Sequence, residues 1–238
     1  FISWVWPEAI GYEALNARWK ANQDSKVKAH VVEHEAYRYW DHWLSDGRVP
    51  RIFVVDVATQ RITDLFAGTP YELPAADPSA HHYDISPDGR EVAFTFDPAT
   101  EKRFDHEYHV VALDLRAKQF RVLTKGSRLS HASPSYSPDG KSMAVLACNL
   151  RRSPVAEARI ILIDRESGRM KPFPGTWDRS VNAPVAWERD SACVIFLAED
   201  RARTHAYRWR LGAKAPEIAA RGGTITDISA AGGSIAFV

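Results

Sequence analysis

The sequence contains little sulfur and no long apolar segment. Its 238 residues include two cysteines and two methionines, and no apolar run approaches the ~18 residues of a membrane-spanning helix. No signal peptide is visible at Phe1. Cys148 and Cys193 lie on predicted strands of neighbouring repeats, at positions that differ by a few residues. This favours buried free thiols and leaves open whether the two cysteines pair.

An excess of charge of one sign is also lacking. The chain has 31 basic and 30 acidic residues, a net charge of +1, and no clustered basic stripe. A nucleic-acid-binding surface is therefore not indicated. No phosphate-cradling loop, Walker pattern or Cys-x-x-Cys pair occurs either, so nothing indicates a nucleotide cofactor or a cysteine-based metal site.

What the sequence does contain is a repeated turn. Ser86-Pro87-Asp88-Gly89 recurs 51 residues later as Ser137-Pro138-Asp139-Gly140, with similar strand-like flanks. Proline presets φ near −65°, aspartate bonds back to the chain, and glycine accepts the positive φ that closes a tight hairpin. A repeat of this length, built from short alternating strands, indicates a β architecture assembled blade by blade.

A second signal recurs in phase with the first. Three apolar strands each end in an aspartate that opens a polar turn, at residues 52–56, 110–114 and 160–164. Degenerate copies of the first turn lie near residues 188 and 230. Together these signals predict four strands per repeat, which is one propeller blade. We therefore predict an all-β, partial β-propeller of four-stranded antiparallel blades (TolB/WD40-like) with one irregular insertion; a β-sandwich with coincidental turns is the alternative.

The repeats also suggest how the chain is organised. Both ends read as mid-strand segments at a similar phase of the repeat, so we expect residues 1–238 to be a fragment of one propeller domain in a longer protein. Open blade edges would then favour association of the isolated chain, such as a homo-oligomer. The expected parts are an aromatic-rich insertion at 7–50, blade-like repeats at about 51–80, 81–130, 131–180 and 181–223, and the start of another repeat at 224–238.

The insertion departs from the repeat. We expect a short helix or loop from Pro7 to about Gln23, and a strand at Lys26–Val31, where polar and apolar residues alternate. Five of the eight tryptophans lie in the first 43 residues, and the segment Tyr37–Trp43 packs four aromatics around a histidine. Such density either fills an irregular core or lines a binding surface. The substrate-cavity candidates are Tyr37, Arg38, Trp40, Asp41 and Trp43.

Several of these elements resemble a known family. The segments Trp4–Glu8, Ser25–Ala29 and Tyr37–Trp43 resemble the N-terminal propeller of prolyl oligopeptidase family serine peptidases. The branch most similar is that of the dipeptidyl peptidase five-like and acylaminoacyl peptidase-like enzymes. Trp177–Val181, Trp187 and Ala198–Asp200 resemble later blades of the same branch, whereas TolB-like propellers share the Ser-Pro-Asp-Gly turn.

The resemblance implies that the catalytic residues lie in a domain other than the propeller. In this family a separate α/β-hydrolase domain carries the serine, aspartate and histidine, with the serine in Gly-x-Ser-x-Gly. That pattern is absent here; Gly126-Ser127 and Gly232-Gly233-Ser234 do not satisfy it, so no catalytic residue is assigned. The chain alone is expected to be inert and to need no cofactor. Its implied partners are short peptides and the hydrolase domain, and its implied compartment is the periplasm or the exterior.

Other readings of the same residues stay open. Arg38 and Asp41 either hold a peptide terminus or the hydrolase domain, or simply pair with each other. Likewise, the Trp177-Asp178-Arg179 group is either part of a site or a blade-edge aromatic anchored by an ion pair. At the level of function, the alternatives are a TolB-like protein-binding propeller without catalysis and a metal-dependent propeller lyase.

Histidine clusters raise the question of metal binding. His30-Val31-Val32-Glu33-His34 matches a zinc-peptidase pattern, but that chemistry needs both histidines on one face of a helix. In the expected strand, positions i and i+4 lie ~13 Å apart, which disfavours zinc. His81-His82 and Asp105–His109 are expected to be surface residues at a strand's start and beside a hairpin, so no metal ligand is assigned.

Overall fold

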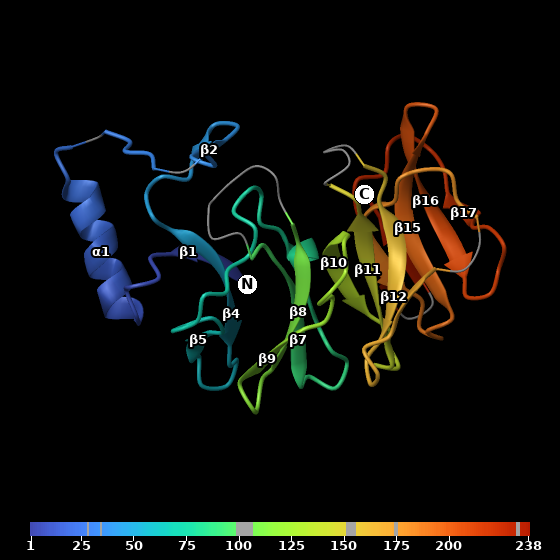
Figure 1. Cartoon of the computed structure of the whole chain (residues 1–238), viewed down its shortest axis with the longest axis horizontal. Helices are drawn as coiled ribbons and strands as arrows, with labels where there is room; N and C mark the ends of the chain where they lie inside the picture. The colour runs from blue at the N-terminus through green and yellow to red at the C-terminus, as the bar shows by residue number, and fades with distance from the viewer. Residues whose placement is uncertain (28, 34, 99–106, 151–155, 174–175, 232–233) are drawn as a thin grey trace. The chain divides into compact units, whose positions relative to one another are not determined.

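The computed structural model describes residues 1–27, 29–33, 35–98, 107–150, 156–173, 176–231 and 234–238 (Figure 1). These residues form β-strands, one α-helix, α1 (Tyr12–Asp24), and one 3-10 helix, η1 (Ala80–His82). The chain divides into two compact units, one of residues 1–80 with 96–106 and one of residues 81–95 with 107–238. Sequence features at Lys28, His34, Asp105, His106 and Gly232-Gly233 lie outside the described residues.

The larger unit is a series of antiparallel sheets in which neighbouring strands follow chain order. Three sheets have four strands each, and the last described sheet has two. The sheets are β6 (Tyr83–Ile85), β7 (Glu91–Phe96), β8 (His109–Asp114) and β9 (Gln119–Val122); β10 (Ser130–Tyr136), β11 (Ser142–Cys148), β12 (Arg159–Asp164) and β13 (Met170–Pro172); β14 (Asn182–Trp187), β15 (Cys193–Asp200), β16 (Arg203–Arg210) and β17 (Glu217–Ala220); and β18 (Ile228–Ala231) with β19 (Ser234–Phe237). Such four-stranded meanders are propeller blades.

The repeated turns close the hairpins as the sequence predicts. The Ser86 hydroxyl donates to Asp88 at 2.6 Å and the Ser137 hydroxyl donates to Asp139 at 2.6 Å. Gly89 and Gly140 take φ values of 66° and 67°, which a side chain would strain. At the second type of turn the aspartate accepts backbone N–H bonds; Asp114, for example, accepts from Ala117 at 2.6 Å. Identical chemistry therefore recurs in successive sheets.

The sheets pack on one another through their buried faces. Strands β11 and β15 are almost wholly buried, and the core cluster containing Phe196 and Trp209 draws on both the β10–β13 and β14–β17 sheets. The first strands of successive sheets adjoin, because β10 contacts β6 and β14, and β14 contacts β18. Successive first strands side by side are the arrangement of a propeller, so the predicted fold class is confirmed and the β-sandwich alternative is wrong.

The smaller unit holds a three-stranded antiparallel sheet in the order β1 (Ile2–Val5), β4 (Val49–Val55) and β5 (Ile62–Asp64). The long connection between β1 and β4 contains α1 and a short hairpin, β2 (Arg38–Tyr39) and β3 (His42–Trp43). Within the described residues of this unit, buried Trp6, Phe66 and Leu73 supply much of the core. No residue of α1 is buried.

Two expectations for the insertion can be compared with the structure. Of the two alternatives expected from Pro7 to about Gln23, a short helix or a loop, the structure has a helix, which begins at Tyr12 directly after Gly11 with φ of 87°. The predicted strand at Lys26–Val31 is wrong, because the described residues of this segment adopt no strand. Val27 and Val31 are 74% and 73% exposed. An alternating pattern makes a strand only when a neighbouring strand and an apolar surface are available to it, and within the described residues this segment pairs with no strand and leaves both valines exposed.

Candidate functional site

The aromatic segment folds into a tight hairpin with an exposed tip. Pairing of Arg38 with Trp43 and of Tyr39 with His42 leaves Trp40 and Asp41 as the two-residue turn. Trp40 has φ of 49°, a conformation usually taken by glycine or asparagine at such turns, and its side chain is 80% exposed. The Arg38 Nε donates a hydrogen bond to the Trp40 carbonyl and so braces the turn.

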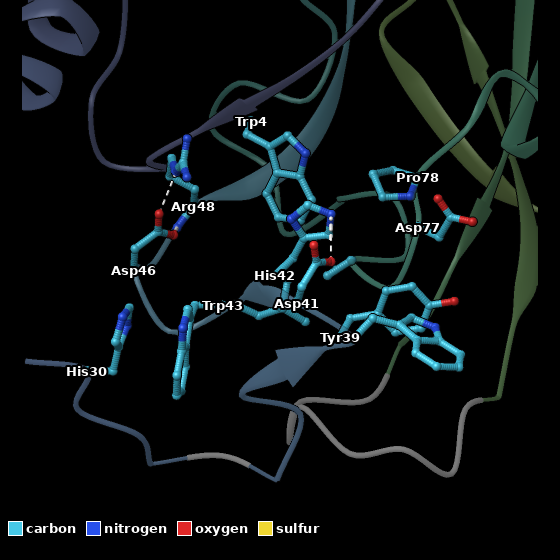
Figure 2. Close-up of a pocket in the computed structure, with 13 residues that line it drawn as sticks. Trp4, His30, Tyr39, Asp41, His42, Trp43, Asp46, Arg48, Asp77 and Pro78 are labelled. Carbon is cyan, nitrogen blue, oxygen red and sulfur yellow. Dashed lines mark hydrogen bonds and ion pairs between the residues drawn. The ribbon is translucent and has the colours of Figure 1, made fainter.

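This hairpin forms one side of a pocket of about 760 Å³ within the smaller unit (Figure 2). The volume falls within the range typical of small-molecule and peptide side-chain sites. The lining residues come from β1, from the insertion and from the segment after β5: Trp4, His30, Tyr39, Trp40, Asp41, His42, Trp43, Leu44, Asp46, Arg48, Ala75, Asp77 and Pro78.

The indole of Trp43 is held by ring contacts. The His30 imidazole stacks on it with ring centroids 4.0 Å apart and planes 10° apart, and His30 Nδ1 lies 3.2 Å from the Ser45 hydroxyl. The Arg38 guanidinium carbon lies 5.8 Å from the Trp43 ring centroid. These contacts fix the orientation of an indole that is still 43% exposed, so its free surface is available to a ligand.

A second cluster, formed by Trp6, Trp19 and Arg48, anchors the insertion to the sheet. The Arg48 guanidinium lies 5.7 Å from the Trp6 ring centroid and 5.4 Å from that of Trp19 on α1. Its Nε pairs with Asp46 Oδ2 at 2.6 Å, while Trp6 Nε1 donates to the Asp46 carbonyl at 2.8 Å. Trp6 is buried, so these contacts tie both the helix and one wall of the pocket to the core.

The acidic groups of the pocket differ in their pairing. Asp46 is neutralised by Arg48, whereas Asp41 pairs with His42 Nε2 at 3.4 Å in an exposed contact (Figure 2). In the part of the chain that the structure describes, Asp77 makes no hydrogen bond or ion pair, and it takes φ of 70°. The lining therefore holds three carboxylates, of Asp41, Asp46 and Asp77, and a single guanidinium, of Arg48, so carboxylates are in excess over guanidinium groups.

The five cavity candidates are only partly brought together. Trp40, Asp41 and Trp43 line the pocket. Tyr37 lines a separate pocket of about 570 Å³ instead, and Arg38 supports the hairpin from behind its turn. Among the described ion pairs none joins Arg38 to Asp41, so the alternative in which these two simply pair is not what is observed.

Of the thirteen lining residues, ten were not among the sequence-based candidates, including Tyr39, Trp4 and Asp77. Tyr39 lay inside the aromatic segment and Trp4 inside the Trp-Pro-Glu element, so aromatic density was a usable signal for both. Asp77 lies more than thirty residues beyond the hairpin and carries no local pattern. Only the path of the chain after β5 brings it to the same pocket.

The Trp177-Asp178-Arg179 group lies in the larger unit and is structural in character. Trp177 packs edge-on against Phe196 and Tyr207, with ring centroids 5.5 and 4.8 Å away. The Arg179 guanidinium lies 5.1 Å from the Trp177 ring and 3.8 Å from Asp200. This geometry supports the interpretation as an aromatic anchored by an ion pair.

Metal and thiol chemistry find little support in the described residues. His30 lies outside any helix, which removes the helical zinc arrangement, and His109 Nδ1 lies 3.2 Å from the Thr124 hydroxyl. Glu188, Asp190 and Cys193 place potential ligand atoms within 4.8 Å of one another, but Arg208 engages Glu188 at 2.7 Å. Cys148 and Cys193 are both free thiols, as expected; Cys193 is buried, whereas Cys148 is only partly buried. Burial raises the pKa of both.

Comparison with solved structures shows the fold. The chain is similar to TolB from Acinetobacter baumannii, with a TM-score of 0.52 and 18% identity over 71% of this chain and 37% of that one. It is also similar to a putative dipeptidyl aminopeptidase IV from Bacteroides ovatus, with a TM-score of 0.52 and 12% identity over 74% of this chain and 34% of that one. These likenesses show a TolB-like propeller fold.

Sequence relatives are more specific. The chain is 25% identical to dipeptidyl-peptidase 5 of Porphyromonas gingivalis over 81% of its own length, and 32% identical to that of Porphyromonas endodontalis over 53%. The predicted resemblance to this group of peptidases is thereby confirmed. The chain spans 28% and 19% of the length of these two relatives, and no protein-family model matches it. Of the helices in the described residues, none has both the length and the apolar character that crossing a membrane requires.

Proposed function

We propose that this chain is the non-catalytic propeller portion of a serine peptidase that cleaves short peptides, of dipeptidyl or acylaminoacyl type. In this role it limits access to the catalytic domain and contributes to substrate recognition. The observation that carries the proposal is an open aromatic pocket, built on the insertion, in a chain that is similar to dipeptidyl-peptidase 5 and has no Gly-x-Ser-x-Gly.

The physical basis of gating is steric. Rigid, closely packed sheets placed over a hydrolase domain enclose a space that admits peptides and excludes folded proteins. The buried faces of β11 and β15 and the hydrogen-bonded turns give this chain the required rigidity. A pocket of about 760 Å³ accommodates one or two side chains, which fits recognition of a peptide and does not fit a folded surface.

The test uses the full-length protein that contains this chain. The peptidase proposal expects a Gly-x-Ser-x-Gly serine in the sequence beyond Val238, and activity on dipeptidyl or N-acylaminoacyl substrates that is lost when this serine is replaced. Replacing Trp40 with alanine should raise KM about 3- to 30-fold with little change in kcat, because a contact made before and during reaction is removed. Val57, which is 89% exposed, gives a matched control as Val57→Ala.

Two outcomes would contradict the proposal separately. A full-length protein without the serine motif excludes the peptidase assignment. An active enzyme in which Trp40→Ala leaves KM and kcat unchanged excludes the recognition role while leaving the peptidase assignment in place. From the family resemblance we also expect the protein in the periplasm or outside the cell, which fractionation of the source cells would check.

A TolB-like binding propeller is the second candidate. Two observations favour it: the fold match to TolB is as good as the match to the peptidase-like structure, and the lining of the pocket contains no serine, threonine or cysteine. In that case the hairpin would contribute to binding a protein partner, and the protein would not hydrolyse peptides. The presence or absence of the serine motif distinguishes the peptidase from the binding propeller. Assays of the Trp40→Ala variant for peptide hydrolysis and for partner binding then show which activity depends on the hairpin.

A further inference from the structure

The pocket has the chemistry of a site for an organic cation. Four aromatic side chains line it, namely Trp4, Tyr39, Trp40 and Trp43. Ring faces attract a cation within about 6 Å through their quadrupole, and indoles do so most strongly. One of these rings already has a cation beside it, since the guanidinium of Arg38, which does not line the pocket, lies 5.8 Å from the Trp43 ring centroid.

The charges of the pocket reinforce this preference. Among the lining residues Arg48 is the only lysine or arginine, and its Nε pairs with Asp46 Oδ2 at 2.6 Å. That leaves Asp41, which has only an exposed histidine partner, and Asp77, which has no partner in the described residues. A cationic group entering the pocket would therefore meet two carboxylates that no lysine or arginine already neutralises.

From these observations we propose that the pocket binds a cationic side chain of a peptide, that of lysine or arginine. The proposal rests on the proposed function and names the substrate class that the same pocket would select. Trp40 and Tyr39, whose ring centroids lie 6.4 Å apart, pack on the methylene stem of the side chain, and Asp77 and Asp41 attract its charged end. The carboxylate of Asp77 has no structural role in the described residues, because no other described group bonds to it.

The shape of the site favours a side chain over a terminal amino group. A pocket of about 760 Å³ with several aromatic walls rewards burial of a long apolar stem, which lysine and arginine carry beneath their charge. An α-amino group is attached directly to the backbone and offers no stem to these walls. The stem contributes through apolar burial and the charge through the carboxylates, so both parts are required for tight binding.

The proposal can be tested by direct binding to this chain. Four probes are titrated by calorimetry or by quenching of tryptophan fluorescence: N-acetyl-lysine amide, N-acetyl-arginine amide, N-acetyl-norleucine amide, which keeps a stem without a charge, and alanine amide, which keeps a free amino group without a stem. We expect the two cationic acetyl amides to bind about 10-fold more tightly than either other probe, with weaker binding at high salt.

Variants assign the effect to the pocket. Asp77→Asn should weaken N-acetyl-lysine amide about 5-fold and leave N-acetyl-norleucine amide unchanged, because only the charged end loses its partner. Asp24→Asn, at the end of exposed α1, is the matched control and should change neither. Circular dichroism of both variants verifies that the fold is retained.

Three results would overturn the proposal. The first is equal affinity for the lysine and norleucine probes, and the second is tighter binding of alanine amide. The third is no binding of the cationic probes, either at 10-fold above the concentration at which another probe saturates or, if no probe saturates, at ~100 mM. Because the assay needs no catalytic domain, these results are independent of whether the full-length protein is a peptidase. Conversely, an inactive full-length protein would leave a positive binding result intact.

Discussion

The backbone N–H of Tyr136 donates a hydrogen bond to Oδ2 of Asp84 over 2.7 Å, between the first strands of two neighbouring sheets. The other oxygen of Asp84 accepts the N–H of Ile85 at 2.8 Å. The carboxylate of Asp84 thus accepts one hydrogen bond within its own strand, β6, and one from the end of β10, the first strand of the next blade. Burial raises the pKa of Asp84, and the two N–H donors oppose that effect.

Removing this carboxylate should loosen the junction between the two sheets. For Asp84→Ala we expect a loss of about 1–3 kcal/mol in the free energy of unfolding, because a buried backbone donor loses its acceptor. Urea titration measures the change. Asp227 accepts the N–H of Ile228 at 2.8 Å in the same local way, with no bond to a neighbouring sheet, so Asp227→Ala is the matched control. Equal losses in both variants would show that the inter-sheet bond contributes nothing.

The Tyr136 hydroxyl makes a second junction between the same sheets. It donates to Glu91, whose carboxylate also lies 3.5 Å from Arg165 Nε, and Arg165 covers the Tyr136 ring at 5.4 Å. Burial, followed by the Glu91 contact, raises the pKa of Tyr136. We expect Tyr136→Phe to lower the free energy of unfolding by about 1–2 kcal/mol, measured by thermal or urea unfolding. Tyr12→Phe, on a side chain 81% exposed, should be neutral.

The repeated turns make stability dependent on acid pH. The Ser137 hydroxyl bond, ahead of the Lys141 N–H, lowers the pKa of Asp139, and hydrogen bonds likewise lower the pKa of Asp88, Asp56, Asp114 and Asp164. A carboxyl with a lowered folded-state pKa contributes stability that is present above its unfolded value of 3.8 and is lost as the pH falls through its folded-state pKa. Asp139→Asn should therefore flatten the dependence of unfolding free energy on pH below about 4.

The measurement is a series of urea titrations between pH 2.5 and 7 on the parent chain, Asp139→Asn and the control Asp24→Asn. The difference between parent and Asp139→Asn should shrink as the pH falls, whereas the control should follow the parent throughout. A difference that stays constant with pH would mean that Asp139 acts by its shape and its hydrogen bonds and not by its charge.

Helix α1 should depend mainly on Trp19 for its attachment. The helix has no buried residue, and Trp19 connects it to Trp6, at 6.3 Å between ring centroids, and to Arg48. Arg18 adds an exposed contact, with its guanidinium 5.7 Å from the Trp6 ring centroid. Trp19→Ala should expose the amides of α1 to hydrogen exchange at least 10-fold faster while the sheets keep their protection, since isolated helices of this length are marginal. Tyr12→Ala on the same helix is the control and should leave exchange unchanged.

Trp40 allows a test of whether a strained backbone conformation is retained because the side chain binds a ligand. Its φ of 49° favours glycine, so Trp40→Gly should leave the chain equally stable or stabilise it by about 0.5–1 kcal/mol. The same change removes an exposed indole from the pocket and should weaken binding of N-acetyl-lysine amide by about 3- to 10-fold. Thermal unfolding and calorimetry read out the two effects. Clear destabilisation by glycine would show that the indole holds the hairpin together.

The sequence was sufficient for features that depend on neighbouring residues. The Ser-Pro-Asp-Gly and strand-ending aspartate turns form where they were predicted, because each is completed by side chains two to five residues away, as with Ser86, Asp88 and Glu91. Aromatic density indicated the segment Tyr37–Trp43 but not that it forms a hairpin, and three of the candidates named there, Trp40, Asp41 and Trp43, line the pocket. The strand at Lys26–Val31 failed because alternation specifies a strand only when a partner strand exists.

Other features required the fold itself. Asp84 and Tyr136 are fifty-two residues apart, and Asp77 lies far from the hairpin in sequence; neither relation has a local pattern. The periodic turns and apolar strands were encoded in short stretches, since they depend on local backbone geometry. The pocket, its unpaired carboxylate and the bonds between sheets arise only when distant segments are packed together, because proximity in space is a property of the folded chain.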